Sequence, residues 1–378
     1  MISLFFLGLL LLLALWNLYY SKRWCRNLTV SLNFLQNYVY AGEQAQMTEQ
    51  IENRKKLMLP VLEVSFHMDK RLVFHDCENT NVSDYAYKRD IFALLGNQRV
   101  TRKLTLDCPK RGYYKINESY LTSFSMLHKR RFSMGCPADT ELYVYAARTD
   151  VSDILVACER LMGNIQCAKR LYEDPFAFSS IREYTVTDPM NTINWKASAR
   201  TGELMVNTFE STLTEKVMIC LDVEDSGILK YEYLVEESVS IASSLAQKLI
   251  ARGMEVGICV NDSDVILIEP AGGRKQLNNI ERILAKCQSD GNIIPFTALL
   301  SAQSDILRQP LQQSSFESSE DTVMIFISKN AERNQPAIES FAGSSQQVIW
   351  VLPYTKNDTC SIKTQDNIHL IKREVERN

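Results

Sequence analysis

The sequence has few of the residues from which metal sites and disulfide frameworks are built. It contains four histidines and ten cysteines, but no C-x-x-C motif and no Cys/His pairing at metal-ligand spacing. Zinc sites and disulfide scaffolds need such clusters, so we expect no metal and no cofactor. Most cysteines are predicted to be small buried side chains in a reducing compartment. The histidines also show no base–nucleophile spacing with a Cys or Ser; they are His67, His75, His128 and His369.

The chain also lacks a strong net charge. Its formal charge is −3 and its isoelectric point is near 6.0, so it has no global attraction to nucleic acid. Hydrophobic residues make up 46% of the 378 residues, which is enough for two soluble domains with separate cores. The basic run His128–Arg131 has no interleaved aromatic residues and is predicted to be a solvated loop or a membrane-facing patch. We expect no nucleic-acid partner.

One stretch is long enough and apolar enough to cross a membrane. Residues 1–21 are almost entirely apolar, and a helix of about 20 residues would span the roughly 30 Å core of a bilayer. A cleaved signal peptide fits less well, because no basic residue precedes the apolar run and no small-x-small cleavage site follows it. Lys22, Arg23 and Arg26 lie just after this segment. The positive-inside rule then predicts a single-pass protein of the cell membrane whose soluble domains face the cytoplasm.

Residues 27–149 are predicted to form an all-β domain. Apolar and polar residues alternate from Leu28 to Phe34 and again from Val100 to Leu106, which is the pattern of half-buried strands. Turn-forming residues separate such runs, for example at Gly42 and at Gly96-Asn97. Short alternating strands without intervening helices indicate a small β-sandwich of immunoglobulin-like type.

Residues 215–378 show a different pattern, in which short apolar runs alternate with helical segments. Val217–Leu221 and Val256–Val260 have the length and composition of buried strands, and Tyr231–Arg252 between them has helical periodicity. A tight turn after Val260 leads into Val265–Ile268, which predicts an antiparallel hairpin beside an otherwise parallel sheet. Strands that alternate with helices indicate a doubly wound α/β fold. Further strands are expected at Val323–Ser328, Val348–Leu352 and Ile368–Ile371.

Residues 150–214 join these two domains and contain the densest run of charged, aromatic and turn-forming residues in the chain. A predicted amphipathic helix over Asp150–Met162, with Ser152 as its N-cap, leads into this run. Two interpretations are open. The run can recognise an anionic or planar partner, or it can form a polar lock that clamps the two domains together, with Trp195 supplying packing area. The candidate residues are Arg182, Glu183, Tyr184, Asp188, Asn194, Trp195, Lys196, Arg200 and Gly202.

The order of motifs in this segment resembles the signature of a bacterial and archaeal family called domain of unknown function 58. Arg182-Glu183-Tyr184 is followed by a turn with Asp188-Pro189, then by Asn194-Trp195-Lys196 and by Ala199–Leu204. The resemblance implies a membrane-anchored protein with a β-sandwich and a C-terminal von Willebrand factor A-like domain. It also implies a protein partner, because members of the family are often encoded beside MoxR-type AAA+ ATPases and transglutaminase-like proteins.

In the von Willebrand factor A-like domains that this resemblance implies, the first strand commonly ends in an Asp-x-Ser-x-Ser motif that binds a divalent metal ion. The corresponding residues here are Asp222, Glu224 and Ser226, so Glu224 replaces the first Ser. Lys329 follows a later strand where a metal-binding Asp would be expected. Its ammonium would repel a cation and is expected to pair with Asp222. We therefore predict a degenerate site without metal, since hard cations need several well-placed oxygens.

These features leave two classes of function. The first is a non-catalytic, membrane-anchored adaptor or scaffold that recruits other proteins, with a MoxR-type AAA+ ATPase as the partner that the resemblance implies. The second is a hydrolase or transferase that acts on cell-envelope components through the carboxylates of residues 172–210. The absence of a nucleophile–base pair from the sequence favours the adaptor. Identifying the proteins or envelope fragments captured from solubilised membranes would discriminate between the two.

Overall fold

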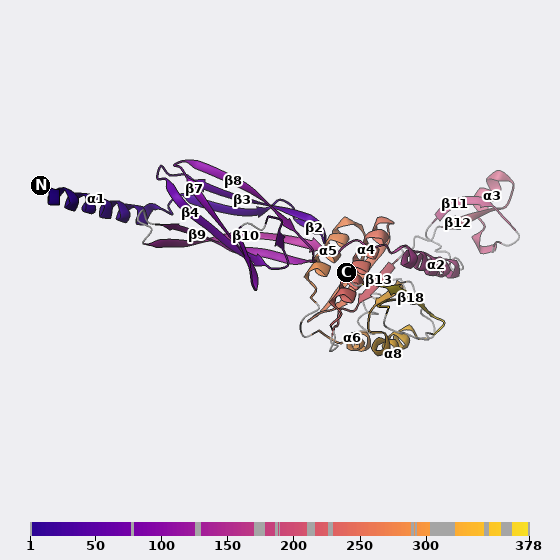
Figure 1. Ribbon diagram of the computed structural model, residues 1–378. Coiled ribbons are helices and arrows are strands. Elements are labelled where there is room, and N and C mark those ends of the chain that lie inside the picture. Colours follow the sequence, from indigo (N-terminus) through magenta and orange to yellow (C-terminus); the bar gives the residue numbers. More distant parts are fainter. Residues whose placement is uncertain are drawn as a thin grey trace. The chain divides into compact units, whose positions relative to one another are not determined.

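The computed structural model divides the chain into two compact units (Figure 1). The first, here the sandwich unit, contains Met1–Arg148 and Glu281–Cys287, and the second, here the parallel-sheet unit, contains Thr149–Ile280 and Gln288–Asn378. The structure describes residues 2–76, 79–124, 130–169, 178–185, 188, 190–209, 216–225, 230–288, 291, 293–302, 322–343, 348–356 and 365–376.

Helix α1 (Ile2–Arg23) covers the predicted membrane segment and ends in the core of the sandwich unit. It is long and apolar enough to cross a membrane. Tyr20 and Trp24 are both buried. The Tyr20 hydroxyl lies 2.7 Å from Ser123 Oγ, and the Trp24 ring stacks on Phe132. Because these side chains belong to the core, packing fixes the orientation of α1 relative to the sandwich.

The sandwich unit consists of two β-sheets, as the alternating pattern predicted. The strand orders are β1-β3-β8-β5 and β2-β10-β9-β4-β7-β6, and apolar side chains from both sheets meet in two buried clusters. Among the described strands of this unit, β2 and β10 pair in parallel and the other pairs are antiparallel. The strands are β1 (Leu28–Phe34), β2 (Tyr38–Tyr40), β3 (Gln44–Asn53), β4 (Leu59–Asp69), β5 (Val73–Phe74), β6 (Thr80–Val82), β7 (Tyr85–Leu94), β8 (Gln98–Asp107), β9 (Gly112–Phe124) and β10 (Arg131–Tyr145).

A cluster of ionisable side chains is buried within the sandwich unit. Glu49 on β3 lies directly opposite Arg102 on β8 in the strand register. Lys88 and Asp90 on β7 are also buried, and Asp90 Oδ1 lies 2.9 Å from Arg102 Nη1. Burial, followed by the nearby Asp90 carboxylate, raises the pKa of Glu49 to about 7. The folded sandwich therefore holds a proton on Glu49 at pH values where an exposed Glu is ionised.

We predict that Glu49→Gln makes the stability of the sandwich less dependent on pH. The pKa of Glu49 rises from 4.5 to about 7 on folding, so its contribution is full below about pH 4.5 and is lost as the pH rises through 7. The loss is on the order of 3 kcal/mol. Hydrogen exchange of the β3 and β8 amides in the full chain, corrected for intrinsic rates, measures it. The same pH dependence in wild type and variant would contradict the prediction.

The parallel-sheet unit is built around a six-stranded sheet of order β15-β14-β13-β16-β17-β18. β15 pairs antiparallel with β14 at one edge and the other pairs are parallel, which confirms the predicted hairpin. One face of the sheet packs on α6 and α8, and α2 and α4 contact the sheet without joining that apolar cluster. The elements are α2 (Ser152–Lys169), β13 (Lys216–Leu221), α4 (Glu232–Ala251), β14 (Glu255–Asn261), β15 (Val265–Ala271), α5 (Gly273–Lys286), α6 (Phe296–Ala302), β16 (Thr322–Ile327), α8 (Ala331–Ala342), β17 (Val348–Tyr354) and β18 (Ile368–Glu374).

Helix α2 confirms the predicted amphipathic helix but not its predicted N-cap. Ile154, Leu155 and Cys158 are buried, as their helical spacing predicted. Ser152 is the first helical residue, and its backbone N–H and hydroxyl both donate to Asp150 Oδ1, at 3.2 and 2.6 Å. The Asp150 side chain therefore caps this end of the helix in place of Ser152. Hydrogen bonds from Ser152 and Lys248 hold the pKa of Asp150 at about 2.

The carboxyl ends of β13 and β16 mark the point where the strand order reverses. Counted from β13, the order is 3-2-1-4-5-6, and sheets of this order bind ligands in the crevice at the reversal. Asp222 directly follows β13, Asn261 is the last residue of β14, and Ser328 directly follows β16. The topology thus brings three polar residues from distant parts of the sequence to one edge of the sheet.

Candidate functional site

Asp222 is fully buried at the end of β13, and hydrogen-bond donors occupy both of its carboxylate oxygens. Oδ1 accepts from the backbone N–H of Glu224 at 3.0 Å and from Asn261 Nδ2 at 2.9 Å. Oδ2 accepts from three side chains of the segment that follows β16, namely Ser328 Oγ at 2.7 Å, Asn330 Nδ2 at 3.1 Å and Asn334 Nδ2 at 2.8 Å.

This set of donors leaves the Asp222 carboxylate without room for a metal ion. A carboxylate offers about four lone-pair positions, and five donors already approach the two oxygens of Asp222. Burial raises the pKa of Asp222, while the hydrogen bonds from Ser328, Asn261 and Asn330 act in the opposite direction. Neutral amide and hydroxyl donors thus stand where a cation would have to coordinate.

The two other carboxylates after β13 are engaged by cations. Glu224 Oε1 lies 2.6 Å from Arg333 Nη1, and Asp225 forms an ion pair with Lys329 in which both side chains are buried. The expectation that Lys329 pairs with Asp222 is therefore wrong. Neutral donors already surround Asp222, and the Lys329 ammonium pairs instead with Asp225, three residues further along the chain. Ser226, the third residue of the degenerate motif, lies outside the described residues.

The geometry changes the reason for which metal binding is predicted to fail. Within the described ranges, no group of three or more His, Cys, Asp or Glu side chains is arranged to hold a metal ion. The sequence pointed to repulsion by Lys329, whereas the structure points to saturation of Asp222 by neutral donors. Absence of a metal stays a prediction.

We predict that Asp222→Ala destabilises the parallel-sheet unit by about 3 kcal/mol, because it leaves several buried donors without an acceptor. Cys220 and Cys259 are buried free cysteines of the same sheet, so the rate at which a thiol reagent reaches them in urea reports unfolding of this unit. Asp264→Ala is the matched control, since Asp264 is exposed. Equal thiol reactivity in the two variants would show that the Asp222 network does not stabilise the sheet.

The second candidate site is a hairpin that carries a short helix. β11 (Phe178–Glu183) pairs antiparallel with β12 (Met205–Phe209), and η1 (Met190–Thr192) and α3 (Trp195–Thr201) lie between them in the sequence (Figure 1). Asn194 Oδ1 caps α3 by accepting from the Ala197 N–H at 3.0 Å, and Asn194 Nδ2 donates to Asn207 Oδ1 on β12 at 2.8 Å. Gly202 ends the helix in the left-handed region, with φ of 82°. Asn194 therefore both starts the helix and ties it to the hairpin.

Arg182 and Asp188 form a bidentate ion pair that closes the segment after β11. Arg182 Nη1 and Nη2 lie 2.7 and 2.6 Å from the two oxygens of Asp188. Thr185 donates both its backbone N–H and its hydroxyl to Asp188 Oδ2, at 2.8 and 2.7 Å. Hydrogen bonds from Arg182 and Thr185 hold the pKa of Asp188 well below its usual range. Arg182 therefore has a structural role, because it pairs with Asp188. We do not group it with the exposed cations Lys196 and Arg200.

Trp195 is 67% exposed, so the interpretation in which its indole packs in a core is wrong. In the described part of this segment, Ile193 and Val206 are buried instead, and they pair in a β-bridge. Lys196 and Arg200 are exposed, and one helical turn separates them, as their spacing predicted. They line a hollow of about 470 Å³ together with Ile181, Asn194, Ala197, Thr201 and Met205.

The sequence-predicted residues of this segment thus fall into two groups. Tyr184 is half-buried and its N–H donates to the Leu204 carbonyl at 2.8 Å, so it positions the hairpin, as do Arg182, Asp188, Asn194 and Gly202. The exposed group is Glu183, Trp195, Lys196 and Arg200. We call the surface formed by Trp195, Lys196 and Arg200 the α3 face.

Sequence reasoning missed the donors around Asp222. It also missed two exposed apolar residues of the segment that contains α3. Asn261, Ser328, Asn330 and Asn334 were not singled out, although Asn261 and Ser328 stand at strand ends next to the point where the strand order reverses. The rule that ligands bind at the carboxyl ends of the strands where the order reverses could have identified these two residues. Met190 and Leu204, which are exposed here, carried no signal of their own.

A single family model matches a range of the chain that includes residues of both candidate sites. The family model described as "Protein of unknown function DUF58" matches residues 180–334. Over this range the chain is similar to DUF58 proteins. The matched range begins just before the Arg182–Asp188 ion pair and ends at Asn334, the last donor to Asp222. Both candidate sites therefore lie within the range that the family model matches.

Solved structures resemble about a third of the chain. The CARDB domain of the PF1109 protein from Pyrococcus furiosus matches at a TM-score of 0.21 and 12% identity, covering 31% of this chain and 93% of its own. A non-cellulosomal cohesin from Archaeoglobus fulgidus matches at 0.22 and 10%, covering 32% and 92%. These likenesses add nothing to the description of the sandwich fold that the strand pairing provides. No curated protein matches this chain.

Proposed function

We propose that this DUF58 protein is a non-catalytic, membrane-anchored adaptor that recruits a protein partner through its α3 face. The observation that carries the proposal is the exposure of Trp195 beside Lys196 and Arg200 on a capped helix. Tryptophan and arginine are the residue types that most often dominate binding energy at protein interfaces. An exposed indole with two cations fits a partner surface that presents apolar and acidic side chains.

The local structure prepares the α3 face for binding. Asn194 fixes the start of α3 on the hairpin, and Ser198 links it to β12 because its hydroxyl accepts from the Met205 N–H at 2.9 Å. A rigid surface loses less conformational entropy on association than a flexible one. Asp188 is held by Arg182 and Thr185, so the carboxylate with the most strongly shifted pKa of this segment has a structural role. This arrangement favours an adaptor over a hydrolase or transferase.

We infer that the parallel-sheet unit is a von Willebrand factor A-like domain whose metal site has been replaced by the Asp222 network. The strand order, the antiparallel edge strand β15 and the place of Asp222 after the first strand support this inference. From its two largely antiparallel sheets we infer that the sandwich is of immunoglobulin-like type. From the length and apolar composition of α1 we infer that this helix anchors the protein to the cell membrane. The partner that the family resemblance favours is a MoxR-type AAA+ ATPase.

We predict that Lys196→Glu combined with Arg200→Glu abolishes partner capture from solubilised membranes without changing thermal unfolding, because exposed charges contribute little to stability. Trp195→Ala should weaken capture about 30-fold, the effect of losing a strong interface residue. Arg274→Glu with Lys275→Glu is the matched control, since it reverses two exposed cations elsewhere in the same unit. Capture is measured by affinity purification of the full chain with mass spectrometry.

Two results would contradict the α3 face as the binding surface. Capture that survives in both double variants would place the contact elsewhere. Capture that is lost equally in both would show a general effect of charge. A MoxR-type ATPase among the proteins lost from the α3 variant alone would support the partner assignment, and its equal recovery from both variants would sink it.

We predict that the soluble units face the cytoplasm, because Lys22, Arg23 and Arg26 follow the apolar helix. Lys103 is exposed on β8, so Lys103→Cys provides a reactive thiol on the sandwich. A maleimide that cannot cross membranes should label this cysteine only after the cells are opened. Labelling in intact cells would place the sandwich outside.

A further inference from the structure

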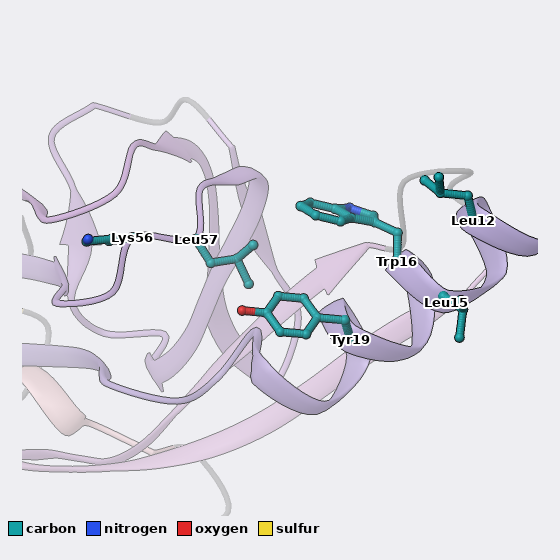
Figure 2. A pocket seen from close by; sticks show the side chains of 6 residues that line it. All are labelled: Leu12, Leu15, Trp16, Tyr19, Lys56 and Leu57. Carbon is teal, nitrogen blue, oxygen red and sulfur yellow. The ribbon is translucent and has the colours of Figure 1, made fainter. Parts of the chain in front are cut away.

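A groove lies where α1 meets the sandwich unit. It has a volume of about 510 Å³ and is lined by Leu12, Leu15, Trp16 and Tyr19 of the helix and by Lys56 and Leu57 of the loop between β3 and β4. Figure 2 shows the Leu57 side chain directed toward Trp16 and Tyr19. Apart from the Lys56 ammonium and the polar tips of two aromatic rings, the lining is hydrocarbon. The groove therefore suits a hydrocarbon chain.

Packing holds both walls of this groove in place. Tyr20 and Trp24 fix the helix wall, because they are buried in the sandwich core next to the residues that line the groove. Asn53, which is fully buried, fixes the loop wall by donating to the carbonyls of Leu57 at 3.0 Å and Leu95 at 2.8 Å. The groove is thus a built feature of the junction between helix and sandwich.

Cations surround the groove without acidic residues in the same segments. Lys22 and Arg23 at the end of α1 and Lys56 on the loop are exposed, and residues 18–27 and 54–58 contain no Asp or Glu. Arg23 lies over the Tyr19 ring, 5.2 Å from its centroid. Lys56 is one of the lining residues, and in Figure 2 its ammonium points away from the apolar helix. A long cationic side chain adopts this arrangement where apolar and polar layers meet.

The same end of the sandwich also exposes apolar side chains. Met58 and Leu95 are 56% and 64% exposed; Met58 follows Leu57, and Asn53 bonds the carbonyls of both Leu57 and Leu95. Trp16 and Tyr19, with their amphipathic rings, are the residue types that gather at the headgroup level of bilayers. Apolar tips, interfacial aromatic residues and exposed cations on one end are the chemistry of a surface that meets anionic lipid.

We propose that this groove binds an anionic phospholipid, with an acyl chain along Leu12 to Tyr19 and the phosphate among Lys22, Arg23 and Lys56. The inference rests on the membrane anchoring in the proposed function and adds a ligand to it. A helix from another protein would use the apolar walls but would leave the cations without a counter-charge. A phospholipid uses both.

The test measures which lipid lies beside Trp16. The full chain is reconstituted in phosphatidylcholine bilayers that contain phosphatidylglycerol, with bromine on the acyl chains of either one lipid or the other. Bromine quenches nearby indoles, and the difference between wild type and Trp16→Phe isolates the signal of Trp16. We expect phosphatidylglycerol to be preferred about fivefold at Trp16 for each cation that contacts the phosphate.

The variants separate a bound anionic lipid from other occupants. Lys56→Glu should remove most of the preference, whereas Lys70→Glu, after the far end of β4, should keep it. Equal quenching by both lipids in wild type, or equal loss in the two variants, would overturn the proposal. Protection of Trp16 from both brominated lipids would mean that a protein segment fills the groove, which also overturns it.

Flotation of the vesicles distinguishes failure of this proposal from failure of the proposed function. Chain that floats with the vesicles but shows no lipid preference is anchored without the lipid site, so only the present inference fails. Chain that does not float with vesicles of any composition is not anchored by α1. In that case the membrane anchoring fails, and the lipid site fails with it.

Discussion

The network around Asp222 is the interaction on which the rest of the parallel-sheet unit depends. One carboxylate at the end of β13 accepts from Asn261 at the end of β14 and from Ser328, Asn330 and Asn334 after β16. It therefore ties together three strand ends and the first turns of α8. The same bonds occupy the crevice in which sheets of this order commonly bind ligands. The hydrogen bonds to Asp222 therefore both stabilise the unit and fill the crevice.

In the proposed function, recognition uses a surface other than that crevice. The α3 face is exposed, and its supporting bonds from Asn194 and Ser198 lie within the hairpin, so it does not depend on a ligand at the strand ends. At the other end of the chain, Tyr20 and Trp24 make α1 continuous with the sandwich core. The chain thus combines a long apolar helix packed into the sandwich with an exposed face on α3. The proposed adaptor role rests on these two features.

Local patterns predicted most of the fold, and pairings between distant residues were not predictable. Alternation along β1 and β8, and the tight turn between β14 and β15, depend on near neighbours and were read correctly. The choice of Asp225 by Lys329 depends on how β13 and β16 place residues that are 104 positions apart. Likewise, the residue type of Trp195 suggests burial, but Ile193 and Val206 are the buried side chains there and Trp195 is exposed. Sequence reasoning identified residues 150–214 as the candidate segment. It did not predict which of its residues hold the hairpin together and which are exposed.

The central claim is that the strand-end crevice is closed and that the α3 face binds the partner. Hydrogen exchange of the full chain, with and without the partner that it captures, tests this claim most directly. The account predicts added protection in residues 193–206 and unchanged exchange in residues 222–225 and 328–334. Added protection at the strand ends, with none on α3, would contradict it.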